Sequence, residues 1–153
     1  MMDIRSEKQD MDNLRMTFEV AKASLDPSTK VGGILLLKDG RRVPTYNAFM
    51  TLEDHDVPLV SREHRYADVL HAEERVLLEL GSDRAEGGWY YGTHEPCGRC
   101  WKLLDMMGIQ RVVFLTTSDD RRERWGCDTE GAQIARRRIQ RRHPNAIVEV
   151  AAL

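Results

Sequence analysis

Two spacings of apolar residues divide the chain into helical and extended stretches. Apolar residues that recur every three or four positions predict four helices, over residues 8–25, 72–80, 96–107 and 129–142. Short apolar or alternating runs predict five strands, over residues 31–37, 41–49, 89–91, 111–116 and 146–153. Glycine or proline lies next to several of these boundaries, as is typical where an element starts or stops.

The order of these elements predicts the fold class. The first two strands form a hairpin at Asp39-Gly40, and Pro44 assigns the second strand to a sheet edge or a bulge. The later strand–helix–strand units favour parallel pairing with right-handed crossovers. We therefore predict an α/β fold, a three-layer α-β-α sandwich around a mixed five-stranded sheet. Residues 50–69 are polar and fit no element, and a loop of that length is often functional.

Length and composition indicate one soluble domain. A chain of 153 residues is long enough for one domain with a hydrophobic core, and we predict a single domain over residues 1–153. No apolar run approaches the roughly 20 residues that span a bilayer, and residues 1–10 lack the apolar core of a signal peptide. We therefore expect a cytoplasmic protein without a membrane partner. The net charge of -2 gives no overall attraction to nucleic acid, so we do not expect a nucleic-acid partner.

Arginines are concentrated in the last third of the chain. They could form a surface for RNA, a nucleotide effector or a substrate phosphate, or they could be the solvated face of a helix. We favour the solvated face, on which Arg136, Arg137, Arg141 and Arg142 point outward. Packing is likewise the expected role of the aromatic residues Trp89, Tyr90, Tyr91 and Trp101.

One pair of short motifs carries the chemistry. The residues H-A-E at positions 71–73 are followed by P-C-G-R-C at positions 96–100, a pattern known as the signature of zinc nucleobase deaminases. Zinc prefers four tetrahedral nitrogen and sulfur ligands, and a catalytic site leaves one position open for water. Both motifs begin a predicted helix, and two such helix starts can converge beside a sheet. We therefore predict that His71, Cys97 and Cys100 bind Zn²⁺.

Glu73 follows the predicted histidine ligand by two residues, so its carboxylate can stay off the metal and face a substrate ring. Zinc lowers the pKa of a bound water from about 15.7 to about 7, which makes hydroxide available at neutral pH. We predict that Glu73 takes a proton from this water, gives it to a ring nitrogen and later protonates the departing amine.

Two other interpretations of the cysteines stay open. Cys97 and Cys100 could be half of a structural zinc site, which would need a fourth ligand such as His94 or Cys127. They could also be a redox pair, which would leave Glu73 unexplained. Cys127 is otherwise interpreted as incidental.

Further stretches of the sequence resemble the cytidine deaminase-like superfamily, and most of all its deoxycytidylate (dCMP) deaminase branch. The resemblance lies in D-P-S-T-K-V-G at residues 26–32, Y-N-A at residues 46–48, S-R-E-H-R-Y at residues 61–66 and T-H-E-P-C at residues 93–97. It implies hydrolysis of dCMP to dUMP and ammonia, with Zn²⁺ as cofactor, and assembly into a homo-oligomer.

The same resemblance implies substrate contacts. Asn47 is expected to touch the sugar or the base, and Ser28, Thr29 and Lys30 are candidates for the 5′-phosphate, since hydroxyls and an ammonium can bind phosphate. Turn formation is the alternative role for Asn47, and local backbone hydrogen bonding is the alternative for Ser28 and Thr29. His94, close to the predicted cysteine ligands in sequence, is a further expected neighbour of the substrate.

Two residues depart from the dCMP deaminase pattern. Arg75 stands where the branch has asparagine, and Ala48 stands where it has glycine. These departures leave other substrates open: a nucleoside, guanine, a modified cytosine or tRNA adenosine. A non-catalytic zinc-binding module is the alternative from another class, and the presence of Glu73 counts against it, because a structural site does not need that carboxylate.

Overall fold

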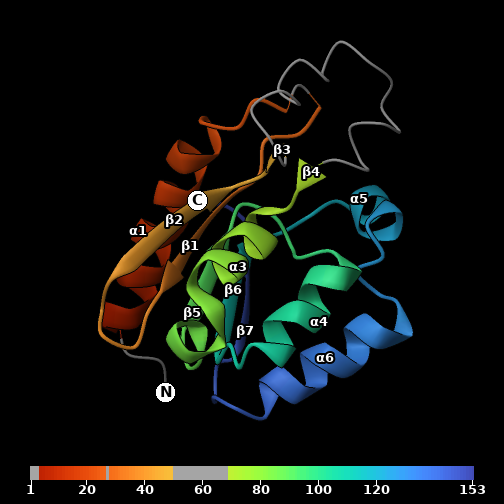
Figure 1. Cartoon of the computed structure of the whole chain (residues 1–153). Coiled ribbons are helices and arrows are strands. Elements are labelled where there is room, and N and C mark those ends of the chain that lie inside the picture. The colour runs from red at the N-terminus through yellow and green to blue at the C-terminus, as the bar shows by residue number, and fades with distance from the viewer. Residues whose placement is uncertain (1–3, 27, 50–68) are drawn as a thin grey trace.

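The computed structural model describes residues 4–26, 28–49 and 69–153 (Figure 1). The predicted loop over residues 50–69 and the stretch S-R-E-H-R-Y therefore lie outside the described residues, apart from Val69. Within the described ranges, none of the helices is both long enough and apolar enough to cross a membrane.

Five strands form one mixed sheet in the order β2-β1-β5-β6-β7. Their bounds are β1 Gly32–Leu36, β2 Arg42–Tyr46, β5 Trp89–Gly92, β6 Arg111–Leu115 and β7 Ile147–Val150. β1 is antiparallel to both of its neighbours, while β5, β6 and β7 are parallel. The predicted hairpin and the predicted parallel units are confirmed. Pro44 lies in β2, an edge strand, where the missing N–H of proline is tolerated.

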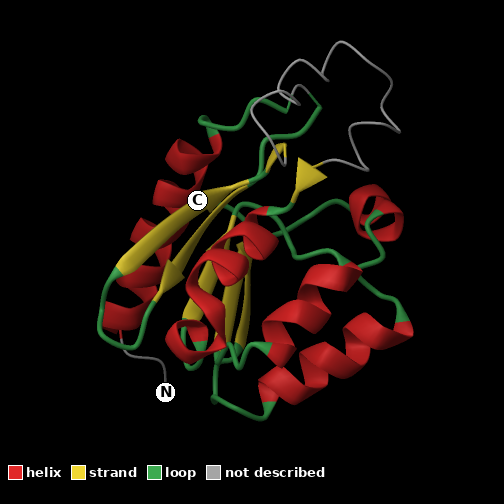
Figure 2. Ribbon diagram, viewed as in Figure 1, coloured by secondary structure: helices red, strands yellow, loops and turns green. Residues whose placement is uncertain are grey.

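Helices cover both faces of this sheet. Their bounds are α1 Ile4–Ala21, α3 Ala72–Ala85, α4 Gly98–Met106, α5 Asp119–Arg124 and α6 Glu130–Gln140. α1 lies against one face, and α3, α4 and α6 lie on the other (Figures 1 and 2). The predicted three-layer α-β-α sandwich is confirmed.

Alternation along the strands builds a core on each side of the sheet. Ile34, Tyr91 and Val113 stand opposite one another in β1, β5 and β6 and pack with Leu14 of α1. Their sequence neighbours point to the other face and form the larger core with α3, α4 and α6. Since successive strand residues alternate between faces, this register fixes which side chains reach the second core.

A buried ion pair fastens α1 to the sheet. Both Nη atoms of Arg111 donate to the Asp10 carboxylate at 2.7 Å, and the Tyr91 hydroxyl donates to it at 2.7 Å. Asp10 is 4% exposed and Arg111 is 2% exposed. Each charge is therefore removed from water and is stabilised by the other.

The first predicted helix ends earlier than its apolar pattern suggests. α1 stops at Ala21, and the next three residues form a turn with hydrogen bonds to the third preceding carbonyl. Leu25, interpreted as the last apolar position of the helix, is 54% exposed and lies outside it. The apolar spacing thus continued by chance beyond the helix.

Other boundaries also differ from the prediction. α3 runs to Ala85 as two helical segments, and the non-helical Gly81 (φ 76°, ψ 168°) separates them, so the first segment ends at the glycine where the predicted helix ends. The predicted strand over residues 41–49 is divided at Asn47, after which β3 (Ala48–Phe49) pairs with β4 (Val69–Leu70) in a separate two-stranded sheet. β7 ends at Val150, before the predicted end at residue 153, and α5 was not predicted.

Candidate active site

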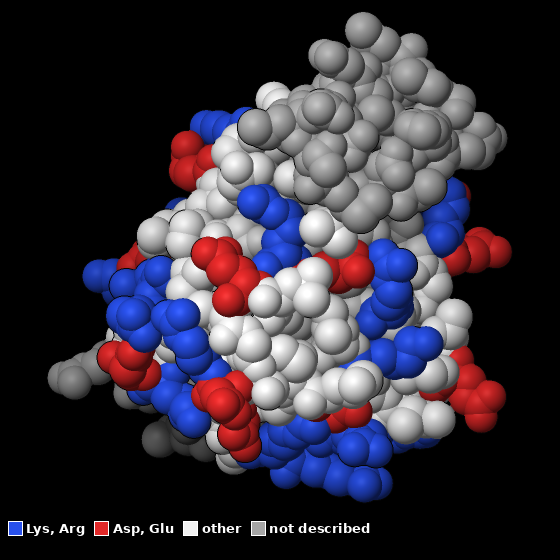
Figure 3. All heavy atoms as spheres, viewed as in Figure 1, with Lys and Arg blue, Asp and Glu red and all other residues white. Residues whose placement is uncertain are grey.

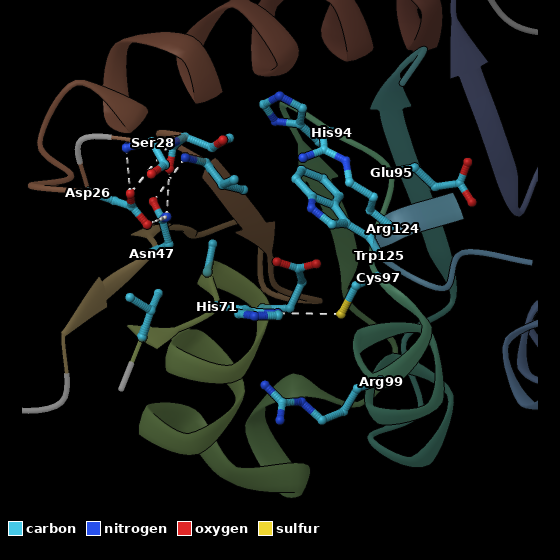
Figure 4. A pocket seen from close by; sticks show the side chains of 15 residues that line it. Asp26, Ser28, Asn47, His71, His94, Glu95, Cys97, Arg99, Arg124 and Trp125 are labelled. Atoms are coloured by element: carbon cyan, nitrogen blue, oxygen red, sulfur yellow. Dashed lines mark hydrogen bonds between the residues drawn. The ribbon is translucent and has the colours of Figure 1, made fainter. Parts of the chain in front are cut away.

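The starts of two helices meet beside the sheet and bring the two motifs together. His71 is the N-cap of α3, and Cys97 is the N-cap of α4, whose first turn contains Cys100. This confirms that both motifs begin helices. Figure 4 shows His71 and Cys97 facing each other across the floor of a pocket. Residues 26 apart in sequence are thus neighbours in space.

The donor atoms of this cluster fit a zinc ion. His71 Nδ1 lies 3.3 Å from Cys100 Sγ and 3.4 Å from Cys97 Sγ, and the three atoms are all within 4.8 Å of one another. Tetrahedral ligands at ordinary Zn–N and Zn–S bond lengths would be roughly 3.5 Å apart, close to these spacings. One nitrogen and two sulfurs also form the donor set of a catalytic zinc site with one position left for water.

Hydrogen bonding in the cluster favours a thiolate. Contacts with Cys100 first, and with His71 next, lower the pKa of Cys97 to about 4. The bond to Cys97 raises the pKa of His71, and the same thiol–thiol contact, together with burial, raises the pKa of Cys100 well above its ordinary value. Cys97 is therefore in the form that binds metals, because the thiolate is the ligand species.

Glu73 lies beside the cluster and is almost fully buried, with 5% exposure. Burial and, next, the negative charge of Cys97 raise the pKa of its carboxyl. The Tyr90 hydroxyl donates to Glu73 Oε1 at 3.4 Å. A Cβ at Gly33 would lie 2.1 Å from that hydroxyl oxygen, so glycine leaves the room that Tyr90 occupies. Sequence reasoning assigned Tyr90 to packing and missed this second contact.

Two side chains outside the cluster fix the helix starts. Glu74 accepts hydrogen bonds from the His71 backbone N–H at 3.0 Å and from Arg99 at 2.9 Å, and so links α3 to α4. The Thr45 hydroxyl of β2 donates to the Ala72 carbonyl at 2.7 Å. The first turn of α3 is thereby held against both the sheet and the neighbouring helix.

A cavity of about 360 Å³ opens above this cluster. His71, Glu73 and Cys97 line it together with two opposing walls. In Figure 4 one wall contains Asp26, Ser28 and Asn47, and the other contains His94, Arg124 and Trp125.

The first wall contains most of the predicted substrate contacts. Asn47 and Ser28 line it, as does Thr29. The Asn47 side chain accepts from Val31 N–H at 2.9 Å and donates to the Thr29 carbonyl at 2.9 Å, so it also shapes the turn that precedes β1. The expected contact of Asn47 with substrate stays a prediction.

Lys30 lies apart from its two predicted partners. It is not among the described residues that line the cavity, and its Nζ donates to the Ser24 carbonyl. The expectation that Lys30 joins Ser28 and Thr29 at a phosphate therefore lacks support from the geometry, because a lysine that folds back on its own loop cannot also extend over the cavity.

His94 lies on the opposite wall, as expected for a substrate neighbour, but both of its nitrogens have protein partners. Nδ1 lies 2.7 Å from the Thr93 hydroxyl, and Nε2 accepts from Arg121 at 2.8 Å. Burial, and then the charge of Arg121, lower the pKa of His94 to about 4, so the ring is neutral near pH 7. His94 also packs edge-on against Trp125, with ring centroids 5.5 Å apart. It therefore presents ring surface to the cavity.

Trp125 and Arg124, at the end of α5, line the cavity. Sequence reasoning missed Trp125, and it favoured a solvated face over a substrate phosphate for the arginines of this third of the chain. The Trp125 carbonyl accepts from Gly98 N–H at 3.0 Å, which joins the segment to the start of α4. α5 has six residues and none of them is buried, so no apolar period marks it. The available signal was Ser118, which caps the helix by accepting from Arg121 N–H, followed by two aspartates.

Glu95 fastens this segment to the cysteine turn. Its carboxylate points away from the cavity (Figure 4) and accepts hydrogen bonds from Arg122 at 2.7 Å, Arg136 at 3.0 Å and Trp101 at 3.3 Å. Cys127 donates to the Pro96 carbonyl at 3.3 Å. Glu95 is 3% exposed, so these contacts compensate a buried charge and make the cysteine turn and the second wall one unit.

The outward orientation predicted for Arg136 and Arg142 is wrong. Arg136 bonds Glu95, and Arg142 donates to the Ile109 carbonyl at 2.8 Å and to Asp105. Arg137 and Arg141 are exposed, as expected. Two of the four side chains thus serve helix packing, because buried carboxylate and carbonyl oxygens lie within their reach. On the face drawn in Figure 3, basic and acidic side chains lie interspersed, with basic ones gathered along the lower edge.

The two departures from the family pattern lie outside the cavity. Arg75 stacks over the Tyr46 ring at 4.4 Å and donates to the Tyr46 carbonyl at 2.7 Å. Neither Arg75 nor Ala48 is among the described residues that line the cavity. Both belong to the packing around the end of β2.

A buried glutamate beside a histidine–cysteine–cysteine cluster, at the start of two helices of an α/β sandwich, defines a zinc hydrolase type of site. The family model described as the cytidine and deoxycytidylate deaminase zinc-binding region matches residues 7–116. The chain therefore belongs to this family, and its cofactor is Zn²⁺.

Curated relatives share about a quarter to a third of their residues with this chain. An uncharacterised deaminase in the luxG 3′ region of Aliivibrio fischeri is 33% identical over 108 residues, which cover 70% of this chain and 72% of that protein. The Homo sapiens deoxycytidylate deaminase is 27% identical over 110 residues, covering 67% and 62% respectively. The chain spans between 53% and 62% of the curated deoxycytidylate deaminases that it matches.

A solved structure agrees in fold. The dCMP deaminase of cyanophage S-TIM5, in its apo form, superposes with a TM-score of 0.64 at 17% identity, over 97% of this chain and 100% of that one. The shared arrangement is the sheet with helices on both faces.

Proposed function

We propose that the protein hydrolyses dCMP to dUMP and ammonia. The observation that carries this proposal is the placement of Glu73 beside the His71, Cys97 and Cys100 donor atoms at the floor of a cavity of about 360 Å³. Supporting it, curated relatives of this chain are named deoxycytidylate deaminases. A cavity of this volume is also in the range of small-molecule sites.

In this proposal His71, Cys97 and Cys100 hold the zinc ion. When bound, zinc supplies a water that is ionised near neutral pH. Two side chains then have supporting roles: Glu74 orients the start of α3 through the His71 backbone, and Cys127 holds the turn at Pro96 without joining the cluster. Within the described part of the chain, Cys127 is not among the residues grouped as metal donors.

Glu73 moves the protons. The oxygen of water first bonds to C4 of the cytosine ring, and the bond from C4 to the amino nitrogen then breaks, so that dCMP and water give dUMP and ammonia. Glu73 takes one proton from the water and delivers it to a ring nitrogen, and it then takes the second proton from the new hydroxyl on C4 and gives it to the departing amine. Its burial excludes competing water, and its contact with Tyr90 limits the positions that the carboxylate can take.

The proposed ligands predict that substitution of two buried cysteines, Cys100 and Cys127, affects zinc affinity to different extents. Cys100→Ser should weaken zinc binding by more than 100-fold, because even the loss of a residue that only hydrogen-bonds to a metal ligand costs about 10- to 100-fold. Cys127→Ser is the matched control, since Cys127 is equally buried and its hydrogen bond to Pro96 can be made by a hydroxyl. Competition with a chromogenic chelator measures both affinities. Equal losses in the two variants would contradict the proposed ligands.

The substrate is tested by comparing dCMP with deoxycytidine. Ultraviolet absorbance follows the loss of the amino group in the zinc-loaded protein. We expect kcat/KM for dCMP to exceed that for deoxycytidine by at least 10-fold, since charge-assisted hydrogen bonds to phosphate contribute about 1.5–3 kcal/mol. Comparable rates would indicate a nucleoside deaminase, and the absence of turnover on both would contradict a cytosine substrate.

The homo-oligomer implied by the family resemblance stays a prediction. Leu78 of α3 is 71% exposed and Met106 of α4 is 81% exposed, and such apolar side chains are suited to a contact between subunits. Analytical ultracentrifugation of the zinc-loaded chain would determine the state of assembly.

A further inference from the structure

The two walls of the cavity differ in charge. Asp26 places a carboxylate on the first wall, where it lines the cavity. Its Oδ1 accepts from the backbone N–H groups of Ser28 at 2.8 Å and Thr29 at 3.4 Å, and its Oδ2 accepts from the Asn47 amide at 3.4 Å. Two backbone N–H groups and one side-chain amide on this wall are therefore already directed at a carboxylate.

The first wall also lacks a compensating cation among the described residues that line it. Lys30 donates to the Ser24 carbonyl and does not reach the cavity. A doubly charged phosphate placed there would lie close to Asp26 and would be repelled by it. The charge distribution of this wall suits neutral or donor groups of a sugar or base better than an anion.

The second wall contains a cation, Arg124. Arg99, the other arginine among the described residues that line the cavity, lies below the His71–Cys97 floor in Figure 4. Arg99 is paired with Glu74 at 2.9 Å, and the Glu74 side chain is only 15% exposed. Among the described residues, the acidic partner of Arg124 is Asp120, at 3.2 Å, and that carboxylate is 79% exposed. An exposed pair within one helix is weak, so Arg124 is the pocket cation that a ligand can recruit at small cost.

The position of Arg124 is fixed relative to the reaction centre. The Trp125 carbonyl accepts from Gly98 N–H, one residue after Cys97. Arg122, two residues before Arg124, bonds the buried Glu95 carboxylate at 2.7 Å. A Cβ at Gly98 would lie 2.5 Å from the Gly126 carbonyl oxygen, which shows how closely the two segments approach. The backbone that carries Arg124 is thus anchored on both sides.

We propose that Arg124 forms the subsite for the 5′-phosphate of the substrate, in place of the predicted Ser28, Thr29 and Lys30. This proposal rests on the proposed function for its choice of nucleotide. The guanidinium of Arg124 can present two parallel N–H donors to phosphate oxygens, a geometry that arginine supplies and lysine does not. Trp125 beside it gives the same wall an apolar surface.

The test compares binding with and without the phosphate. Isothermal titration of the zinc-loaded full chain uses dUMP, deoxyuridine and inorganic phosphate as probes, in the parent protein, Arg124→Gln and the control Arg137→Gln. Arg137 is an exposed arginine on α6, so its removal matches the change in net charge. We expect Arg124→Gln to weaken the binding of dUMP and of phosphate by roughly 10- to 100-fold. Its affinity for deoxyuridine should stay within about twofold of the parent value. Arg137→Gln should bind all three probes like the parent protein.

The outcomes separate this proposal from the function on which it rests. The parent protein could bind phosphate but neither dUMP nor deoxyuridine. If Arg124→Gln then lost phosphate binding while Arg137→Gln did not, the phosphate subsite would stand and the proposed nucleotide substrate would be contradicted. Unchanged dUMP and phosphate binding in Arg124→Gln, or no phosphate binding in the parent protein, would overturn the subsite. Equal weakening of dUMP and deoxyuridine would also overturn it, because a phosphate contact cannot affect a ligand that has none.

Discussion

Glu73→Gln should lower kcat for dCMP by roughly 10²- to 10⁴-fold, the usual contribution of a general acid–base group. Glutamine has nearly the same shape and can still accept the hydrogen bond from Tyr90, but it cannot take up and release a proton. Zinc content should stay at that of the parent protein, since Glu73 is not among the proposed ligands. Absorbance assays with dCMP and metal analysis of the same sample check both expectations.

Tyr90→Phe is the matched control for that experiment. It removes the 3.4 Å hydrogen bond to Glu73 and keeps the buried ring. We expect a decrease in kcat of less than about 10-fold, because the carboxylate would lose an orienting contact and keep its chemistry. Turnover by Glu73→Gln at the parent rate would assign the proton transfer to another group.

Asp10→Asn should lower the free energy of unfolding by about 3–5 kcal/mol, the usual cost of breaking a buried ion pair by removing one partner. Arg111 is 2% exposed and would keep its charge without the carboxylate that compensates it. Tyr91 would also lose its 2.7 Å bond to the carboxylate. Urea unfolding followed by circular dichroism measures the change.

Asp12→Asn provides the matched control on the same helix. Asp12 pairs with Arg15 at 3.5 Å, and both side chains are more than half exposed. Its replacement should change the free energy of unfolding by less than about 0.5 kcal/mol. The double variant Asp10→Leu with Arg111→Met should recover part of the loss, because no uncompensated charge would remain. Equal effects of Asp10→Asn and Asp12→Asn would show that burial does not determine the strength of the first pair.

The metal cluster and the layer order were predictable because both depend on local sequence. Apolar periods mark α3, α4 and α6, and each motif lies where a helix begins, so the convergence of His71 with Cys97 follows from the fold class. The hairpin followed from Asp39-Gly40, and the edge position of β2 followed from Pro44.

What could not be predicted depends on contacts between distant residues. Glu95 bonds Arg122 and Arg136, 27 and 41 positions away, and no spacing rule indicates such pairs. α5 is too short to show a period, so the helix was not predicted. The side chain of Lys30 turns back and donates to a carbonyl of its own loop, and no sequence pattern predicts the direction of such a flexible side chain.

Gly33 has no reactive group, yet its contact with Tyr90 restricts which residues evolution can place at this position. Any side chain at this position of β1 would collide first with the Tyr90 hydroxyl, and that hydroxyl is one hydrogen bond away from Glu73. A substitution at Gly33 would therefore displace the Tyr90 hydroxyl and so disturb the Glu73 carboxylate without contacting it. Among descendants of this chain that keep the activity, we expect this glycine to persist for as long as the tyrosine does, so that the two positions are inherited as a pair.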